Sequence, residues 1–194
     1  MIKKEPTWKS WVVETTTPVF SKQQCEEVIK LGRSMPPQSA LIGMGEKGIK
    51  ETKTRLSHIS WIPFDNPVAV HMYRKLEEVM WVTNKRHFGF ENVEINEQAQ
   101  YTEYPEGGFY DWHMDCDIIM QKEPPVRKIS MTLILSDDSE YEGGGLEIAS
   151  PGKVARPKQG HAVFFASFIN HRVVPVTRGV RKSLVMWFGG EPFK

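Results

Sequence analysis

The sequence contains little cysteine and almost no net charge. Its 194 residues include only Cys25 and Cys116, which are too few for a disulfide scaffold or a cysteine-rich metal site. The formal net charge of +1 argues against a strongly electrostatic partner such as duplex DNA. The net charge therefore gives no evidence for a nucleic-acid partner, but it leaves open a local basic groove.

Long hydrophobic runs are also missing. No apolar stretch is long enough to cross a membrane, and the opening residues MIKKEPTWKSW lack the apolar core of a signal peptide. These absences predict a cytoplasmic protein that has no membrane partner.

The composition is otherwise that of an ordinary globular protein, with 40% hydrophobic and 25% charged residues. No internal repeat or low-complexity tract divides the chain. The length and the composition together predict one domain that spans residues 1–194.

Two amphipathic helices are expected in the first half of the chain. The segment FSKQQCEEVIKLG begins with a capping box formed by Ser21 and Gln24. A second helix is expected to start at DNP, with Asn66 as its cap and Pro67 in its first position. The expected apolar faces are Cys25, Val28, Ile29 and Gly32 on the first helix, and Ala69, Met72, Tyr73, Leu76 and Met80 on the second. Both faces are interpreted as packing surfaces.

From about residue 91 the pattern changes to roughly eight short extended segments. KISMTLILS places Ile129, Met131, Leu133 and Leu135 on one face and Ser130, Thr132 and Ile134 on the other, which predicts a half-buried strand. The earlier segment RLSHISWI is a further expected strand, and the residues between the two helices have a loop-like composition. Helices followed by strands predict an α+β domain, mainly β, built as a sandwich or barrel.

The segment FYDWHMDCDIIM places His113 and Asp115 on one side of an extended chain. Chance gives roughly 0.2 such pairs in a chain of this composition, so the pair alone is a weak signal. A third candidate ligand, His171, lies on a later expected strand that can cross a barrel to reach the pair. Two imidazoles and one carboxylate on one face of a metal form the triad suited to Fe(II) and O2 chemistry.

Arg181 lies ten residues after His171, on the last expected strand. It shares a face with Ser183, Val185 and Trp187. A guanidinium inside a barrel needs an anion, and the neighbouring expected strands offer no obvious acidic partner. The planar guanidinium favours a carboxylate ligand.

With these residues the sequence resembles the 2-oxoglutarate and Fe(II)-dependent oxygenases, specifically their prolyl-4-hydroxylase-like branch. The resemblance covers about residues 18 to 190. It is carried by the spacing of Tyr104, Gly107, Tyr110, His113 and Asp115, by the turn from Gly143 to Leu146, and by His171, Arg181 and Trp187.

The resemblance implies a double-stranded β-helix, or jelly roll, supported by the two helices. It implies that His113, Asp115 and His171 bind Fe(II) and form the catalytic centre. Arg181 would pair with the far carboxylate of the cosubstrate 2-oxoglutarate, assisted by the hydroxyls of Tyr104 and Thr132. Thr132 is chosen because it shares the polar face of its expected strand with Ser130 and Ile134; this chain departs from some relatives, which carry a tyrosine where it has Ile134. Leu146 and Val173 would pack against the cosubstrate, and Phe164, Phe165 and Trp187 would exclude water.

The implied activity is the hydroxylation of a substrate C–H bond by O2 and 2-oxoglutarate, with ascorbate as an auxiliary reductant. The expected substrate is a prolyl residue in a peptide or protein, and residues 43–54 are interpreted as a lid over it. The alternatives are a hydroxylase of a free amino acid or small molecule, a non-catalytic jelly-roll binding module, and a zinc hydrolase that uses the same ligands.

Overall fold

The computed structural model describes residues 10–39, 54–116, 123–149, 152 and 154–193. The expected lid at residues 43–54 therefore lies almost entirely outside the described residues, which include only Thr54 of that segment. Within the described part of the chain, fifteen strands form two facing sheets and a separate two-stranded sheet. The predicted mainly-β, jelly-roll class is confirmed.

The larger sheet has eight strands. Seven follow the order β1–β12–β8–β15–β6–β4–β2, and β5 pairs with β15. Their bounds are β1 Val12–Glu14, β2 Gln38–Ser39, β4 His58–Ile62, β5 Glu94–Ile95, β6 Ala99–Tyr104, β8 Val126–Ile134, β12 Ala162–Ala166 and β15 Arg181–Gly190.

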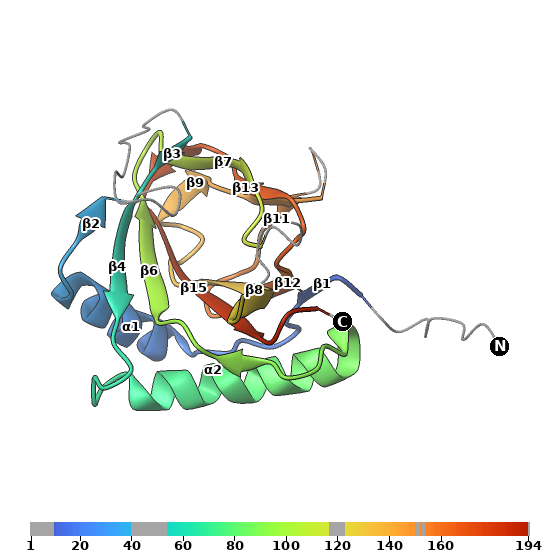
Figure 1. Ribbon diagram of the computed structural model, residues 1–194. Helices are drawn as coiled ribbons and strands as arrows, with labels where there is room; N and C mark the ends of the chain where they lie inside the picture. Colours follow the sequence, from blue (N-terminus) through green and yellow to red (C-terminus); the bar gives the residue numbers. More distant parts are fainter. Residues whose placement is uncertain (1–9, 40–53, 117–122, 150–151, 153, 194) are drawn as a thin grey trace.

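The smaller sheet has the order β11–β10–β13–β7–β3, and β14 pairs with β9 beside it. Their bounds are β3 Arg55–Leu56, β7 Phe109–His113, β9 Tyr141–Gly143, β10 Leu146–Ile148, β11 Val154–Ala155, β13 His171–Val173 and β14 Val176–Gly179. Figure 1 shows the two sheets facing one another. From residue 91 onward the described residues form eleven strands, β5 to β15, where roughly eight were predicted, because several of them are only two or three residues long and carry no periodic signal.

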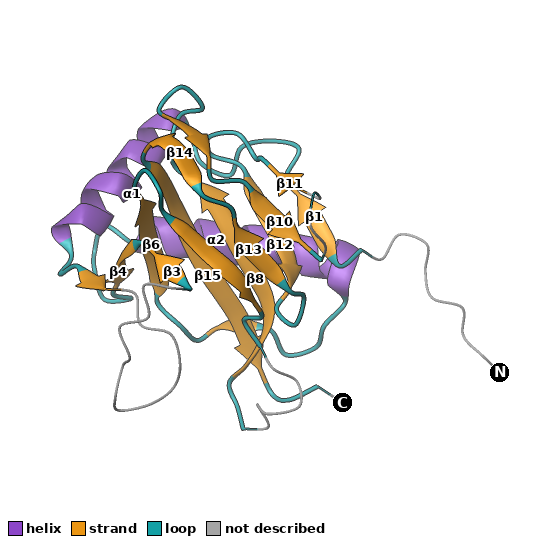
Figure 2. Cartoon of the chain, turned by 90° about the horizontal axis from the view of Figure 1, so that it is seen from above, coloured by secondary structure: helices purple, strands orange, loops and turns teal. Residues whose placement is uncertain are grey.

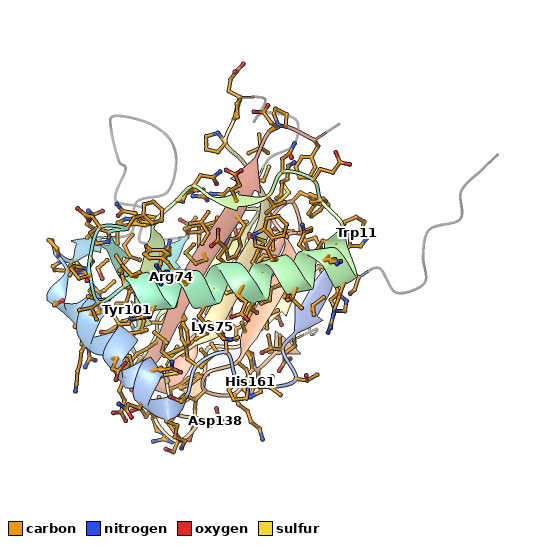
Figure 3. The ribbon with its side chains drawn as sticks, turned by 90° about the horizontal axis from the view of Figure 1, so that it is seen from below. Trp11, Arg74, Lys75, Tyr101, Asp138 and His161 are labelled. Carbon is orange, nitrogen blue, oxygen red and sulfur yellow. The ribbon has the colours of Figure 1, made fainter. Side chains whose placement is uncertain are left out.

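Two helices, α1 (Lys22–Ser34) and α2 (Val70–Thr83), cover the outer face of the larger sheet (Figures 1 and 2). A π-helical turn, η1 (Asn84–Phe88), continues α2. Figure 3 shows α2 lying across the strands, with Arg74 and Lys75 on its exposed side. Among the described residues, no helix is both long enough and apolar enough to cross a membrane.

The predicted start of the first helix is confirmed, because both hydrogen bonds of the capping box are present. The backbone N–H of Gln24 donates to the side chain of Ser21, and the backbone N–H of Ser21 donates to the side chain of Gln24. The predicted start of the second helix was wrong, since α2 begins at Val70. Asn66 caps the turn before the helix: its side-chain oxygen accepts a hydrogen bond from the backbone N–H of Val68, at 2.9 Å. The five predicted core residues of α2 are all buried.

The larger sheet buries both of its faces. Its outer face packs on the helices through Ile129, Met131, Leu133, Leu184 and Met186, among others. Its inner face joins residues of the smaller sheet in a second cluster made of Tyr104, Leu146, Ile148, Val163, Phe165, Val173 and Val176. Strand β8 is therefore buried on both sides, and the prediction of a half-buried strand was wrong. Its polar residues face the interior of the barrel.

Candidate active site

Strand pairing in the smaller sheet brings the two candidate histidine ligands together. His113 ends β7 and His171 begins β13, and the two residues are direct antiparallel partners. Asp115 lies just after β7, and its backbone N–H donates a hydrogen bond to the carbonyl of Ser167, at 2.9 Å. The ligand atoms of His113, Asp115 and His171 all lie within 4.8 Å of one another. Residues far apart in the sequence thus form one compact donor set.

Backbone carbonyls fix the orientation of both imidazoles. His113 Nδ1 lies 2.7 Å from the carbonyl oxygen of Asp111, and His171 Nδ1 lies 3.0 Å from that of Ile169. A carbonyl only accepts hydrogen bonds, so each Nδ1 carries the hydrogen and donates it. Each Nε2 then keeps its lone pair, and both point toward the carboxylate of Asp115, at 3.6 and 3.5 Å. This is the tautomer that a metal-binding histidine needs.

The protonation states also suit a cation. Burial first and the neighbouring His171 second lower the pKa of His113 to about 4. Burial by itself raises the pKa of Asp115, but the two histidines and a hydrogen bond from Ser130 together hold it below its usual value. At neutral pH, His113 is therefore neutral and Asp115 is charged, as metal coordination requires.

Arg181 is the first residue of β15, and its side chain is almost completely buried, with 1% exposed. Its Nη1 donates to Ser183 Oγ at 3.0 Å, and its guanidinium carbon lies 5.3 Å from the ring centroid of Tyr104. Its Nε has no hydrogen-bond partner among the described residues, and burial lowers its pKa. A buried cation with an unused N–H group suits a carboxylate ligand. Arg181 also lines a cavity of about 340 Å³.

Sheet register places the other expected cosubstrate residues on the interior side of the barrel. Tyr104 is the direct partner of Arg181 across β6 and β15. Thr132 pairs with Val163, a member of the inner cluster, so both side chains lie on the inner face. Leu146 and Val173 are partners across β10 and β13 and belong to the same cluster.

Of the three residues expected to exclude water, one faces the wrong way. The rings of Phe165 and His171 have centroids 4.5 Å apart, and Trp187 is buried beside the site. Phe164, in contrast, belongs to the outer core beneath the helices. Successive strand residues alternate between the two faces, so Phe164 and Phe165 cannot both face the barrel interior.

Two arginines that the sequence did not indicate, Arg127 and Arg55, lie against aromatic side chains at the site. The guanidinium of Arg127 lies 3.9 Å from the ring centroid of Trp187 and donates two hydrogen bonds to the carboxylate of Glu97. The guanidinium of Arg55 lies 4.5 Å from the ring centroid of Tyr110. Arg127 stands just before the alternating run of β8, and Arg55 is the first residue of the RLSHISWI segment. Their positions in the sequence give little indication that either side chain lies at the site.

The other polar candidates serve structural contacts or lie apart. Nδ1 of His161 lies 2.8 Å from the carbonyl oxygen of Thr15, outside the triad. Cys116 is buried, and its backbone N–H donates to Ser167, at 3.0 Å. Among the described residues, His113, Asp115 and His171 are the one group of three or more histidine, cysteine or acidic residues placed to hold a metal.

Comparison with known proteins agrees with this geometry. A model of the 2OG-Fe(II) oxygenase superfamily matches residues 99–189, a segment that contains the triad and Arg181. A PKHD-type hydroxylase of Teredinibacter turnerae is 41% identical over 88 residues, which cover 43% of this chain and 39% of the relative. One from Pseudomonas aeruginosa is 26% identical over 170 residues, covering 84% of this chain and 73% of the relative. Relatives such as that of T. turnerae are thus matched over only about two fifths of their own length.

Two solved structures share the fold at low sequence identity. A Pseudomonas putida prolyl-4-hydroxylase has a TM-score of 0.68 at 19% identity, covering 92% of each chain. The viral collagen prolyl hydroxylase of Paramecium Bursaria Chlorella virus-1 has the same score and identity, covering 92% of this chain and 96% of that one. Residues 99–189 of this chain are thus similar to the 2OG-Fe(II) oxygenase superfamily, and the shared fold and the donor set of His113, Asp115 and His171 agree with that similarity.

Proposed function

We propose that this protein is an Fe(II)- and 2-oxoglutarate-dependent dioxygenase that hydroxylates a prolyl residue in a peptide or protein. Two observations carry the proposal: a compact histidine–aspartate–histidine donor set, and a buried arginine that forms no ion pair among the described residues and whose Nε has no hydrogen-bond partner there. A binding module needs neither feature, and a zinc hydrolase has no use for the arginine.

His113, Asp115 and His171 would hold the ferrous ion. Their two nitrogens and one carboxylate occupy three positions of a six-coordinate metal, so three positions stay open for small ligands. The backbone carbonyls behind the two histidines keep each Nε2 directed at the ion and prevent the rings from rotating.

Arg181 would pair with the far carboxylate of 2-oxoglutarate, with the hydroxyls of Tyr104 and Thr132 as further donors. The side chains of Leu146 and Val173 supply an apolar surface for the methylene groups of the cosubstrate. When bound, iron and 2-oxoglutarate would supply the O2-activating chemistry, in which O2 is the oxidant and 2-oxoglutarate is oxidised to succinate and CO2 while the substrate gains one oxygen atom. The protein orients both groups, while Phe165 and Trp187 keep bulk water from the site.

The prolyl substrate is supported by the relatives and by the surroundings of the triad. The solved neighbours include a Trichoplax adhaerens prolyl hydroxylase in complex with a peptide fragment. The ring of Tyr110 stacks on His113, and Arg55 and Arg127 lie against Tyr110 and Trp187. Aromatic rings can pack on a proline ring, and guanidinium groups can donate to peptide carbonyls. A free amino acid remains the alternative substrate.

The test is anaerobic loading with Fe(II), followed by addition of O2, 2-oxoglutarate, ascorbate and a library of proline-containing peptides. We expect 2-oxoglutarate to be converted to succinate and one peptide to gain about 16 daltons, the mass of one oxygen atom. The His171→Ala variant serves as the control and should show neither. Activity with zinc in the absence of 2-oxoglutarate would contradict the proposal, and turnover with free proline alone would favour the alternative substrate.

A further inference from the structure

Two buried serines, Ser130 and Ser167, lie behind the candidate iron ligand Asp115. Ser130 is on β8 and is 1% exposed, and Ser167 directly follows β12 and is completely buried. Ser130 Oγ donates to Asp115 Oδ2 at 2.6 Å, and the hydroxyl oxygens of the two serines lie 2.9 Å apart. The two buried hydroxyl groups and the Asp115 carboxylate therefore form one connected hydrogen-bond network.

The direction of these hydrogen bonds follows from the number of hydrogens. An ionised carboxylate only accepts, so Ser130 must give its single hydroxyl hydrogen to Asp115. The hydrogen between the two serines must then come from Ser167. The result is a one-way relay from Ser167 to Ser130 to Asp115, in which each bond strengthens the next.

Ser167 holds the same ligand a second time through its backbone. Its carbonyl accepts hydrogen bonds from the backbone N–H groups of Asp115 and Cys116, at 2.9 and 3.0 Å. The main chain of Asp115 and its side chain are therefore both tied to the end of β12. This double attachment leaves the carboxylate little freedom to rotate.

The coordination count gives the relay a purpose. An aspartate that used both oxygens would fill a fourth metal position, leaving two where the cosubstrate and O2 together need three. Ser130 already engages Oδ2 with a short, charge-assisted hydrogen bond, which weakens that oxygen as a metal ligand. Oδ1 faces Nε2 of His113 at 3.6 Å, while Oδ2, which accepts the hydrogen bond from Ser130, faces Nε2 of His171 at 3.5 Å.

We propose that Ser130, oriented by Ser167, is a positioning residue that holds Asp115 as a one-oxygen metal ligand and so keeps a coordination position open. The inference rests on the proposed function, since it assumes that the triad binds a metal. It concerns the chain's own hydroxyl groups and can be measured without turnover.

The experiment titrates purified full-length protein with Co(II) alone and records both the affinity and the visible absorption bands, which report the coordination of the ion. Ser130→Ala should lower Co(II) affinity by about 10–100-fold, the usual effect of removing a group that orients a metal ligand. Its bands should also shift from those of the wild type. Ser130→Thr keeps the hydroxyl and should restore both properties, and Ser167→Ala should cause a smaller loss.

Ser60→Ala is the matched control. Ser60 is also buried and donates one hydrogen bond of 2.6 Å, to the carbonyl of Gly32, far from the triad in the fold. It should lose stability but keep the Co(II) affinity and the absorption bands of the wild type.

Equal Co(II) affinity in Ser130→Ala and Ser60→Ala would overturn the proposal. A folded Ser130→Thr that binds as weakly as Ser130→Ala would also overturn it, by showing that packing alone matters. If Ser130→Thr does not fold, Ser167→Ala decides: reduced affinity supports the relay, and unchanged affinity overturns it. If the wild-type protein binds no Co(II), or if His171→Ala binds it as tightly as the wild type, the proposed function and this inference are both overturned. If the wild type binds Co(II) through His171 but Ser130→Ala does so equally well, only this inference fails.

Discussion

The backbone at Gly144 lies directly against the side chain of Arg181. A Cβ atom built on Gly144 would lie 2.8 Å from Cδ of Arg181 and 3.0 Å from Cγ2 of Val176. Gly144 also has a φ of +60°, a conformation that other residues adopt only with strain. The glycine thus makes room for the arginine that we expect to bind 2-oxoglutarate.

Gly144→Ala should weaken 2-oxoglutarate binding, because the new methyl group displaces the stem of Arg181. Gly107→Ala is the matched control: Gly107 has a φ of +78°, but no atom lies within 4 Å of its built Cβ. Both variants should lose about 1 kcal/mol of stability from backbone strain. Titration of the metal-loaded proteins with 2-oxoglutarate should show weaker binding for Gly144→Ala than for the wild type, and no change for Gly107→Ala. Equal 2-oxoglutarate affinities in the two variants would mean that Arg181 can shift without losing its contact with the cosubstrate.

Arg181→Ala should weaken 2-oxoglutarate binding by about 2–5 kcal/mol, the range for cutting a buried charge pair. Arg181→Lys should recover only part of this loss, because an ammonium group lacks the planar two-point geometry. The measurement is the dissociation constant of 2-oxoglutarate, obtained by calorimetry on Fe(II)-loaded protein without O2. Arg178→Ala, which removes an exposed arginine paired with Glu142, is the control. An unchanged constant in Arg181→Ala would remove the proposed role.

The sequence predicted those parts of the site that depend on short-range spacing. His113 and Asp115 are two residues apart, so an extended backbone puts them on one side, and the structure does bring their ligand atoms together with those of His171. Arg181 was expected to lack an acidic partner, and among the described residues it forms no ion pair, although Asp138 and Glu142 line the same cavity. Their roles as ligands stay predictions.

Features that depend on sheet register could not be predicted. The alternation in β8 correctly separated two faces, but it could not show that a second sheet covers the polar one. The contact between Ser130 and Asp115 joins a strand of the larger sheet to the segment that follows β7, and no pattern in either segment predicts it. The late start of α2 has a local cause, because Asn66 caps a turn first and the helix follows.

Gly32→Ala should destabilise the fold, although replacing glycine by alanine inside a helix normally helps. Gly32 lies in α1 against Tyr101 of β6, and a built Cβ would come within 2.3 Å of the tyrosine ring. Overpacking of this kind costs about 1–3 kcal/mol. Urea denaturation should show a lower free energy of unfolding, and Gly32→Ala combined with Tyr101→Leu should recover part of the loss if the ring is the cause. A more stable Gly32→Ala single variant would show that helix and sheet can separate freely.

Glu103 should make stability depend on pH in the acid range. Burial by itself raises the pKa of Glu103, but hydrogen bonds from Tyr101 and Arg33 outweigh it and hold the pKa below its usual value. A carboxyl group with a lower pKa in the folded state stabilises the protein above its unfolded pKa of about 4.3. This contribution is lost as the pH falls through the folded pKa.

The difference in melting temperature between wild type and Glu103→Gln should therefore be largest near pH 6–7, about two units above the unfolded pKa, and should shrink as the pH falls below about 4. Glu77→Gln on the exposed side of α2 removes the same charge and serves as the control. Because Arg33 Nε lies 2.7 Å from the Glu103 carboxylate, Arg33→Met should flatten the pH dependence in the same way. A difference that stayed constant from pH 7 to pH 3 would mean that shape, and not charge, explains the effect of Glu103.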